Sequence, residues 1–484
     1  MQSYNFFLKT HLALRALEVY NLCNFYIHQM KSREQLKKVV VIGGGFAGLN
    51  FVKHIDISRF DVTLIDRNNY HSFPPLFYQV ASSGLEPASI CFPLRRELRK
   101  RHSDRVHFNM GEVTAIDMKR RVVLTPLEEV PFDILVVAAG TTNNFFNMPE
   151  LGNSVYTLKS TAEAIRCRND VLSLLERASM APTRELRRRL LNFVVVGGGP
   201  TGVEIAGALG EMKRYILPRE YPSIDQDDVT ITIVEGSDRV LRTMSEKSSQ
   251  AAAKALQSLM VNLRLGVNTK QYFPYEKRVE LLDGSSLDAS MVIWTAGVTA
   301  VPFEWRNCDT SFIGHGGRFQ TNALCEVAGL HDVYALGDIA LMQGDPNFPQ
   351  GHPQLAQVAL QQSRLLARNL NDVAKGKVDE GGRRKFVYVD KGSMATVGRN
   401  RAVVDLRCGH FHGFVAWMVW MFIHLISILG MRNKITVLIN WIWAYFNYST
   451  SLRLLIHPAR LPLADEFRYF SDDDAKDAPK PDGK

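Results

Sequence analysis

The amino-acid sequence predicts an α/β fold with two parallel-sheet domains, the second inserted in the first, followed by an apolar helical segment. Three observations predict this fold. Residues 38–42 and 192–196 are short apolar runs that each lead directly into a glycine-rich turn. Residues 333–338 form a late run that ends in Gly-Asp and returns the chain to the first domain. Residues 411–446 are very apolar and rich in Trp, Phe and Ile.

The composition is that of an ordinary multidomain globular protein. The chain has 484 residues, of which 46% are hydrophobic and 22% are charged, so wholesale disorder is not expected. The net charge of +9 is compatible with anionic lipid or with nucleic acid. Because no Lys/Arg block with interleaved aromatics stands out, nucleic acid is not expected as a partner.

The cysteines are scattered and form neither a C-x-x-C pair nor a metal-ligand spacing. This pattern predicts reduced, mostly buried thiols in a reducing compartment, and no metal site. The six cysteines are Cys23, Cys91, Cys167, Cys308, Cys325 and Cys408.

The first domain begins with a βαβ unit. Residues 38–42 form a continuous apolar run, as expected of a buried parallel strand. A glycine turn at residues 43–48 follows, then a helical stretch to about His54. A second strand, residues 61–66, ends in the acid Asp66. A later strand, residues 133–140, is expected to join the same sheet and ends at Gly140.

The second domain repeats this order, which indicates an internal duplication. The run 192–196 enters a glycine turn at residues 197–202, and residues 203–213 have helical character. The next strand, residues 229–235, ends in Glu235, and a partner strand, residues 290–297, ends at Gly297. Residues 353–370 are expected to form a further helix.

Each turn has the G-x-G-x-x-G pattern of a Rossmann-like dinucleotide site. The first glycine permits a tight turn, the second lets the backbone approach a pyrophosphate, and the third lets helix and strand pack closely. The helix N-terminus favours the phosphates, and the acid after the second strand accepts hydrogen bonds from a ribose. One copy is a weak signal, but two complete copies are specific.

The outer domain of such an inserted pair is expected to hold FAD and the inner one NADH. The predicted FAD-binding residues are Gly43, Gly45, Phe46, Ala47, Gly48, Asp66, Gly140, Gly337 and Asp338, and the family resemblance given below adds Gln357. The predicted NADH-binding residues are Gly197, Gly199, Pro200, Thr201, Gly202, Glu235 and Gly297, and the same resemblance adds Glu204. A carboxylate at Glu235 would repel the 2′-phosphate of NADPH, so NADH is the expected donor.

Several longer motifs carry a family resemblance that spans nearly all of residues 38–450. They are residues 43–49 (GGGFAGL), 75–81 (PLFYQVA), 197–204 (GGGPTGVE), 294–298 (WTAGV), 334–339 (YALGDI), 356–362 (AQVALQQ) and 394–399 (MATVGR). The chain resembles the type II NADH dehydrogenases, which are single-chain NADH:quinone oxidoreductases among the two-dinucleotide-binding-domain flavoproteins. The glycine motifs are shared with disulfide and ferredoxin reductases, whereas PLFYQVA, AQVALQQ and the apolar C-terminal segment are more specific.

The resemblance implies roles for four catalytic residues. Gln357 and Gln361 match positions that line the quinone site beside the flavin, and their spacing of four puts them on one helix face. Glu204 matches a glutamate near the nicotinamide–flavin contact, and Lys391 matches a lysine that acts with it in proton delivery. The plainer alternatives are solvated glutamines, a helix-start acid favoured by the dipole, and a surface lysine.

The expected function is therefore electron transfer from NADH through FAD to a membrane quinone, without an obvious proton-pumping module. The flavin carries the redox step, so no nucleophile is required. The absence of a cysteine pair argues against disulfide reductases and sulfide:quinone reductases. Two alternatives stay open: a soluble NAD(P)H-dependent flavoreductase that serves a protein acceptor, and a non-catalytic NADH-sensing interaction protein.

The apolar C-terminal segment has three interpretations: a buried helix pair, a spanning helix, or a monotopic hairpin in the membrane interface. Its Trp and Tyr residues and its flanking cations suit an interface, and the resemblance implies the hairpin. The expected location is the cytoplasmic face of the inner membrane in a bacterium, or the mitochondrial inner membrane in a eukaryote. A homodimer is compatible with the sequence.

The complete expected architecture comprises two tandem Rossmann-like FAD- and NAD(H)-binding domains, the second inserted in the first, plus a C-terminal helical membrane-attachment segment. Residues 1–35 form an N-terminal extension, which is a targeting peptide, a poorly ordered arm or an overlong start before Met30. The FAD-binding domain is expected in two stretches, 36–155 and 301–400, on either side of the NAD(H)-binding domain (156–300). A membrane-associating segment (401–460) and a disordered tail (471–484) are expected to follow.

Overall fold

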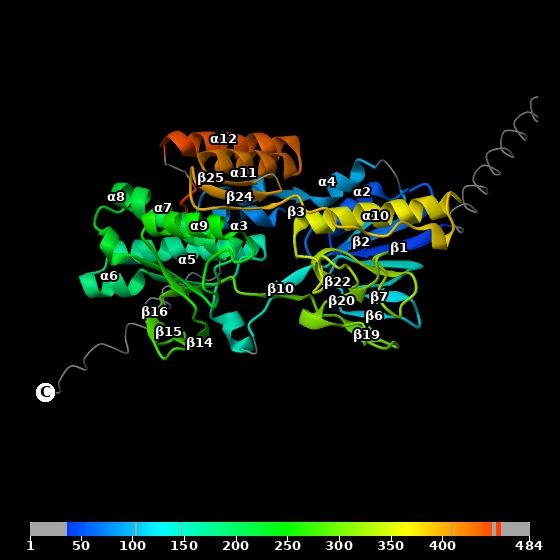
Figure 1. Cartoon of the computed structure of the whole chain (residues 1–484), viewed down its shortest axis with the longest axis horizontal. Helices are drawn as coiled ribbons and strands as arrows, with labels where there is room; N and C mark the ends of the chain where they lie inside the picture. The colour runs from blue at the N-terminus through cyan, green and yellow to red at the C-terminus, as the bar shows by residue number, and fades with distance from the viewer. Residues whose placement is uncertain (1–35, 102–103, 147, 408, 448–451, 456–484) are drawn as a thin grey trace, which may run out of the picture.

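The computed structural model describes residues 36–101, 104–146, 148–407, 409–447 and 452–455. Two lobes lie side by side, and a helical hairpin (α11 and α12, orange to red) lies above the left lobe in Figure 1, the lobe that carries α7 and α9. The expectations for residues 1–35 and 471–484 lie outside the described residues.

The first lobe is built on a parallel sheet with the strand order β21-β9-β1-β2-β5. Its strands are β1 (Lys37–Ile42), β2 (Phe60–Asp66), β5 (Val106–Met110), β9 (Ile134–Val137) and β21 (Val333–Ala335). The helices α2 (Phe46–His54) and α10 (Ala356–Ala374) pack against each other in this lobe. Because β21 pairs in parallel with β9, the late Gly-Asp run completes the first sheet, and the predicted insertion of one domain in the other is confirmed.

The second lobe repeats the architecture with the order β13-β12-β11-β17. Its strands are β11 (Asn192–Val196), β12 (Thr230–Glu235), β13 (Val261–Leu265) and β17 (Met291–Trp294), all paired in parallel. Its main helices are α5 (Thr161–Ser179), α7 (Pro200–Glu211) and α9 (Glu246–Ser258). Both sheets carry continuous buried aliphatic runs, as parallel strands covered on both faces require.

Two neighbouring strands carry the chain between the lobes. β10 (Thr141–Asn143) leads out of the first lobe, and β18 (Val298–Ala300) leads back into it. The two pair in antiparallel register, with Thr142 opposite Thr299. Figure 1 shows β10 in the bridge between the lobes.

Short elements complete the two lobes. The first lobe adds β3 (Tyr70–Ser72), α3 (Phe77–Ala81), β4 (Cys91–Pro93), α4 (Leu94–Arg99), β6 (Ala115–Asp117), β7 (Val122–Leu124), β8 (Glu129–Pro131), β19 (Glu304–Arg306), β20 (Phe319–Thr321) and β22 (Ala340–Met342). The second adds α6 (Arg184–Leu190), α8 (Leu217–Glu220), β14 (Thr269–Phe273), β15 (Arg278–Leu281) and β16 (Ser286–Asp288). Helix α3 packs against both α5 and α7, so it joins the first lobe to the second.

The predicted elements agree with the structure except at their ends. The strands expected at 133–140 and 290–297 are shorter, because the chain leaves each sheet before a glycine in the left-handed region, Gly140 at φ 70° and Gly297 at φ 74°. The helix expected at 353–370 begins only at Ala356, after the extended Leu355. The helix expected at 203–213 begins three residues earlier, at Pro200, and ends in a π-turn at Met212–Ile216.

A three-stranded antiparallel sheet precedes the hairpin. It consists of β23 (Ser393–Thr396), β24 (Ala402–Leu406) and β25 (Gly409–Gly413), and it packs against α7 and α9. The hairpin helices are α11 (Phe414–Ser427) and α12 (Met431–Asn447). Their inner side is anchored in the core by Ala416, Trp420, Val437 and Trp441.

The outer side of the hairpin is apolar and exposed. We call this set the outer hairpin face: Phe414, Val415, Met418, Phe422, Ile426, Met431, Ile435, Ile439, Ile442, Trp443 and Phe446. An exposed apolar surface of this extent marks a site of interaction with a protein or a membrane. Among the helices that the structure describes, none has the length and apolar character needed to cross a membrane.

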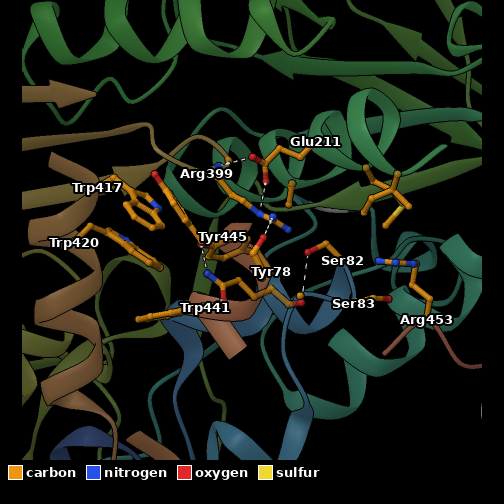
Figure 2. A pocket seen from close by; sticks show the side chains of 17 residues that line it. Tyr78, Ser82, Ser83, Glu211, Arg399, Trp417, Trp420, Trp441, Tyr445 and Arg453 are labelled. Carbon is orange, nitrogen blue, oxygen red and sulfur yellow. Dashed lines mark hydrogen bonds and ion pairs between the residues drawn. The ribbon is translucent and has the colours of Figure 1, made fainter. Parts of the chain in front are cut away.

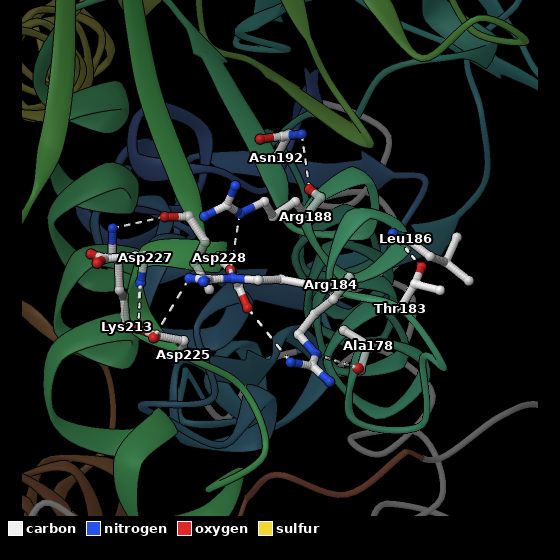
Figure 3. Close-up of polar contacts among 12 residues, drawn as sticks. Ala178, Thr183, Arg184, Leu186, Arg188, Asn192, Lys213, Asp225, Asp227 and Asp228 are labelled. Atoms are coloured by element: carbon white, nitrogen blue, oxygen red, sulfur yellow. Dashed lines mark hydrogen bonds and ion pairs between the residues drawn. The ribbon is translucent and has the colours of Figure 1, made fainter.

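Helix α6 is fixed to the second lobe by one buried carboxylate. None of its residues is buried, yet the side chain of Asp228 is fully buried beneath it. Arg184 and Arg188 donate to Asp228 Oδ1 over 2.6 and 3.0 Å (Figure 3). Burial alone would raise the pKa of Asp228, but these hydrogen bonds hold it below its usual value. The cluster therefore has a structural role.

Candidate functional site

The first glycine turn lies at the carboxyl end of β1. Gly43 has φ 101°, a conformation that favours glycine, and its N–H donates to Ile65 O at 2.8 Å. A Cβ on Gly48 would lie 1.9 Å from the Gly43 carbonyl oxygen, so the close strand–helix approach requires glycine there. Asp66 Oδ2 accepts a hydrogen bond from the Gly44 N–H at 2.6 Å. Phe46 and Ala47 begin α2.

The second turn repeats these contacts at the end of β11. Gly197 has φ 108°, and its N–H donates to Val234 O at 2.8 Å. A Cβ on Gly202 would again lie 1.9 Å from the oxygen of the first glycine. Glu235 Oε2 accepts from the Gly198 N–H at 2.5 Å. Pro200 and Thr201 form the exposed first turn of α7.

Both turns leave room for a pyrophosphate at their middle glycine. Nothing lies within 4 Å of a Cβ built on Gly45 or on Gly199, and each residue is the N-cap of the helix that follows. Free N–H groups and the positive end of the helix dipole are therefore presented to open space. The residues present fit two dinucleotides, one on each lobe.

Several polar side chains converge on the Gly-Asp turn of the first lobe: Thr141, Lys159, Arg318, Gln354 and Gln362. The buried Gln362 accepts the Gly337 N–H at 2.7 Å through Oε1, which holds the turn against α10. Thr141, next to Gly140, donates to Asp338 Oδ2 at 3.4 Å and accepts from Lys159 Nζ at 2.8 Å.

Two cations partly offset the effect of burial on the Asp338 carboxyl, whose pKa stays above its usual value. Burial raises the pKa of its carboxyl, whereas the charges of Lys159 and Arg318 act in the opposite direction. Arg318 also donates to the Asp338 carbonyl at 3.1 Å. Asp338, a predicted FAD-binding residue, thus lies in a compact polar cluster whose members come from separate regions of the chain.

Gln357 and Gln361 lie on one face of α10, but both amides bind backbone. Gln357 donates to Gly392 O at 3.1 Å and accepts from Lys391 N at 3.0 Å. Gln361 donates to Val389 O at 2.9 Å and accepts from Val389 N at 3.0 Å. The two glutamines therefore fix the segment 389–392, while the Lys391 side chain is exposed.

Glu204 is buried between α7 and β23. Its side chain projects from α7, it is 8% exposed, and its Oε1 lies 3.5 Å from Thr396 N of β23. Burial raises the pKa of Glu204 to about 8. The carboxyl is therefore protonated at pH 7, so this buried group can hold and release a proton near neutral pH.

Gln362, Lys159 and Arg318 are site residues that the sequence did not single out. The burial of Gln362 could have been predicted from its spacing, because it lies four residues from both Val358 and Leu366, which are buried on the core face of α10. Lys159 and Arg318 stand in no motif, and only the tertiary structure brings them to Asp338. The four described cysteines are all free: Cys167 and Cys325 are buried, whereas Cys91 and Cys308 are half-buried.

A pocket lies apart from the two turns, between the hairpin and α7. Figure 2 shows its side chains, among them Tyr78 from α3, Glu211 from α7, and Trp417, Trp420 and Trp441 from the hairpin. Arg399 N–H donates to Glu211 Oε1 at 2.5 Å. Its lining contains none of Gln357, Gln361 and Lys391.

The fold and the paired turns define the class of flavoproteins that bind FAD and a nicotinamide dinucleotide. The family model of the pyridine nucleotide-disulphide oxidoreductases matches residues 37–363. A second model, the NDH2 C-terminal domain, matches residues 391–447, which include the antiparallel sheet and the hairpin.

Curated relatives narrow the class. The type II NADH:quinone oxidoreductase Ndh of Mycobacterium tuberculosis is 34% identical over 412 residues, which is 84% of this chain and 87% of that protein. The internal alternative NAD(P)H-ubiquinone oxidoreductase A1 of Solanum tuberosum is 30% identical, covering 84% and 86%. The chain belongs to the type II NADH:quinone oxidoreductase family. The resemblance inferred from the motifs is confirmed.

Solved structures share the fold. NDH2 from Plasmodium falciparum in complex with NADH superposes with a TM-score of 0.78 at 20% identity, covering 87% of this chain and all of that one. The sulfide:quinone oxidoreductase of Aquifex aeolicus has a TM-score of 0.63 at 15% identity, covering 87% of this chain and 96% of that one. The predicted fold class is thereby confirmed.

Proposed function

We propose that this chain is a membrane-associated enzyme that transfers electrons from NADH through FAD to a membrane quinone. The observation that carries the proposal is the pair of matching glycine turns, each with an open middle glycine and an acid bonded to the turn. Membership of the type II NADH:quinone oxidoreductase family supports it. FAD is the cofactor that accepts a hydride from NADH and passes electrons on to a quinone.

The residues of this chain supply binding, orientation and protons. Gly43, Gly45 and Asp66 would hold FAD, with Asp338 beside it, and Gly197, Gly199 and Glu235 would hold NADH. Gln357 and Gln361 would act by fixing the segment that carries Lys391, because both amides bind that backbone. Glu204 would hold the proton that the acceptor needs.

The direct test measures the flavin spectrum, the reduction of the flavin by NADH and the reduction of a quinone. Purified protein should be yellow, its flavin should bleach with NADH in the absence of oxygen, and it should then reduce a long-tailed quinone in vesicles. A soluble flavoreductase would reduce a protein acceptor but not the vesicle quinone. An NADH-sensing interaction protein would not turn over. A folded, colourless protein that cannot be reconstituted with FAD would refute the proposal.

We expect NADH to be preferred to NADPH by at least about 10-fold in kcat/KM, because a 2′-phosphate would meet the Glu235 carboxylate. The position of this carboxylate is fixed by the N–H groups of Gly198 and Ser237. Glu235→Gln keeps a hydrogen-bond acceptor for the ribose but removes the negative charge. The ratio of kcat/KM for NADH to that for NADPH should therefore decrease. Steady-state kinetics with both donors measures it, and equal efficiency in the unmodified protein would contradict the assignment.

We propose that the outer hairpin face inserts into one side of the membrane, as in a monotopic protein, without crossing it. The triple change Val415→Ser, Phe422→Ser and Ile439→Ser removes three side chains that are 63, 62 and 58% exposed. Because each apolar side chain transferred from water contributes about 1–2 kcal/mol, binding to vesicles should weaken by at least about 100-fold.

A matched control removes exposed apolar groups elsewhere. Leu127→Ser, Tyr275→Ser and Leu282→Ser change residues that are 90, 102 and 64% exposed, and this variant should sediment with vesicles as the unmodified protein does. Equal vesicle binding of the two triple variants would contradict the proposal. The bacterial or mitochondrial inner membrane is the proposed location, and the homodimer stays a prediction.

A further inference from the structure

The strand order of the second lobe reverses between β11 and β17. The chain runs from β11 outward to β12 and β13, and then returns to β17 on the other side of β11. In open α/β sheets, a ligand binds beyond the carboxyl ends of the two strands where the order reverses. In this lobe the glycine turn follows β11, and Gly297 follows the last residue of β17 by three positions. NADH is therefore expected to lie across the sheet edge between the turn and Gly297.

The residues around the turn assign the two halves of NADH. Glu235, the acid expected to bind the ribose of the adenosine half, ends β12 on one side of β11. Gly199, with open space at its Cβ position, is expected to meet the pyrophosphate in the middle. The nicotinamide riboside half must then extend to the other side of β11, towards β17 and Gly297.

The side chain of Phe146 lies against Gly297 at this position. A Cβ built on Gly297 would lie 2.5 Å from Cζ and 3.0 Å from Cε2 of Phe146, so the ring packs directly on the Gly297 backbone. Phe146 belongs to the segment that leads from β10 into the second lobe. Its N–H donates to Asn144 Oδ1 at 2.9 Å, and the Asn144 N–H donates to Gly297 O at 3.3 Å. Asn144 thus holds Phe146 next to the end of β17.

Packing within the protein does not account for Phe146. The residue is 55% exposed, and its backbone has φ 45°. The left-handed region costs free energy for an L-residue and is an outlier for a bulky one. The preceding Phe145, by contrast, is half-buried and packs against Trp294 with ring centroids 6.1 Å apart. A strained residue whose ring is left largely exposed indicates a functional contact, which here would be with a ligand.

We infer that Phe146 is a binding residue for NADH, and that its ring packs against the nicotinamide riboside beside Gly297. The inference rests on the proposed function, because it takes the second lobe to hold NADH as the electron donor. The phenyl ring offers an apolar surface to the flat, uncharged ring of reduced nicotinamide. An aromatic contact of this kind strengthens binding about 3- to 10-fold. No redox step is assigned to Phe146.

Phe146→Ala tests this contact in the flavin-loaded enzyme. The KM for NADH should rise about 3- to 10-fold, whereas the inhibition constant of ADP should stay unchanged. ADP has the adenosine and the pyrophosphate of NADH but lacks the nicotinamide riboside. Phe146→Tyr keeps an aromatic ring and should have the KM of the unmodified protein.

Phe146→Gly separates a role in binding from a role in stability. Glycine adopts the φ of 45° at this position without strain. The unfolding temperature of Phe146→Gly should therefore not fall, although its KM for NADH should rise as in Phe146→Ala. Met260→Gly is the matched control. Met260 has φ 60°, but it directly precedes β13 at the amino end of the sheet, so its replacement should leave the KM unchanged.

Three results would overturn the inference. The first is an unchanged KM for NADH in Phe146→Ala. The second is an equal rise in the KM for NADH and in the inhibition constant of ADP, because the ring would then support the whole lobe and not the nicotinamide riboside. The third is an equal rise in KM in Phe146→Gly and Met260→Gly, since the effect would then come from the backbone and not from the ring.

The proposed function is judged by separate measurements. Anaerobic bleaching of the flavin by NADH, and quinone turnover by the unmodified protein, do not depend on which side chain lies beside the nicotinamide riboside. If both occur while the Phe146 results are negative, the inference fails alone. If NADH does not bleach the flavin of the unmodified protein, the proposed function fails and the inference fails with it.

Discussion

Gly45→Ala should yield a folded protein without FAD. The backbone of Gly45, at φ −73° and ψ −160°, suits alanine, and no atom lies within 4 Å of the added Cβ. The methyl group would occupy the space through which a pyrophosphate approaches the turn. Purified protein should be colourless, with an unchanged far-UV circular dichroism spectrum and with the unfolding temperature of the unmodified protein after removal of its flavin.

The equivalent change in the second turn should affect the binding of NADH and not that of FAD. Gly199 has φ −71° and ψ −177° and the same open space. Gly199→Ala should therefore keep the yellow flavin but raise the Kd for NADH about 10- to 100-fold, because the methyl group would keep the pyrophosphate from the N–H groups of the turn and a lost hydrogen bond to a charged group costs about 1.5–3 kcal/mol. Titration of flavin bleaching with NADH measures this loss. If Gly199→Ala lost the flavin and Gly45→Ala kept it, the assignment of the two sites would be reversed.

Glu204→Gln should lower quinone turnover about 100-fold while the flavin content stays normal. A positioned acid or base contributes at least about this factor, and glutamine fills the same space but cannot carry the proton. Glu246→Gln, at the exposed start of α9, serves as the control and should be fully active. Unchanged turnover in Glu204→Gln would remove the residue from the mechanism.

The pH profile gives an independent signature of Glu204. Its folded-state pKa is about 8 because burial disfavours the charged form, so the carboxyl carries its proton below about pH 8 and loses it above. Quinone reduction that uses this proton should fall as the pH rises through about 8. The residual activity of the Glu204→Gln variant should not fall as the pH rises through about 8. If the activity of both proteins falls in the same way, the titrating group is not Glu204.

Local patterns in the sequence predicted the strands, the glycine positions and the terminal acids of the two turns. Gly43, Gly48 and Asp66, and their counterparts Gly197, Gly202 and Glu235, act within single βαβ units. Each unit is defined by a buried strand, a glycine spacing and a terminal acid. The close approach at Gly48 and the hydrogen bond at Gly44 follow from that local geometry. The structure added the hydrogen bonds that Asp66 and Glu235 accept from Gly44 N–H and Gly198 N–H, whereas the contact of each acid with a ribose stays a prediction.

The sequence also predicted the spacing of Gln357 and Gln361 but not the contacts of their amides. A spacing of four places two side chains on one helix face, yet the partner of that face depends on the folded chain. Here the partner is the backbone of residues 389–392. The ligand-facing role that the resemblance implies for these amides therefore stays a prediction, while their hold on the Lys391 segment is observed.

Residue order alone was enough to predict the duplicated α/β units, their glycine turns, the insertion of one domain in the other and the apolar character of the C-terminal segment. The folded chain was needed to show that Lys159 and Arg318 partly offset the burial of Asp338, that Glu204 is buried against β23, and that the ring of Phe146 lies against Gly297. The two sets of features differ in how far apart along the chain the interacting residues lie. Hydrophobic periodicity and glycine conformation act over a few residues, whereas burial, pKa shifts and contacts of this kind depend on which distant segments pack together.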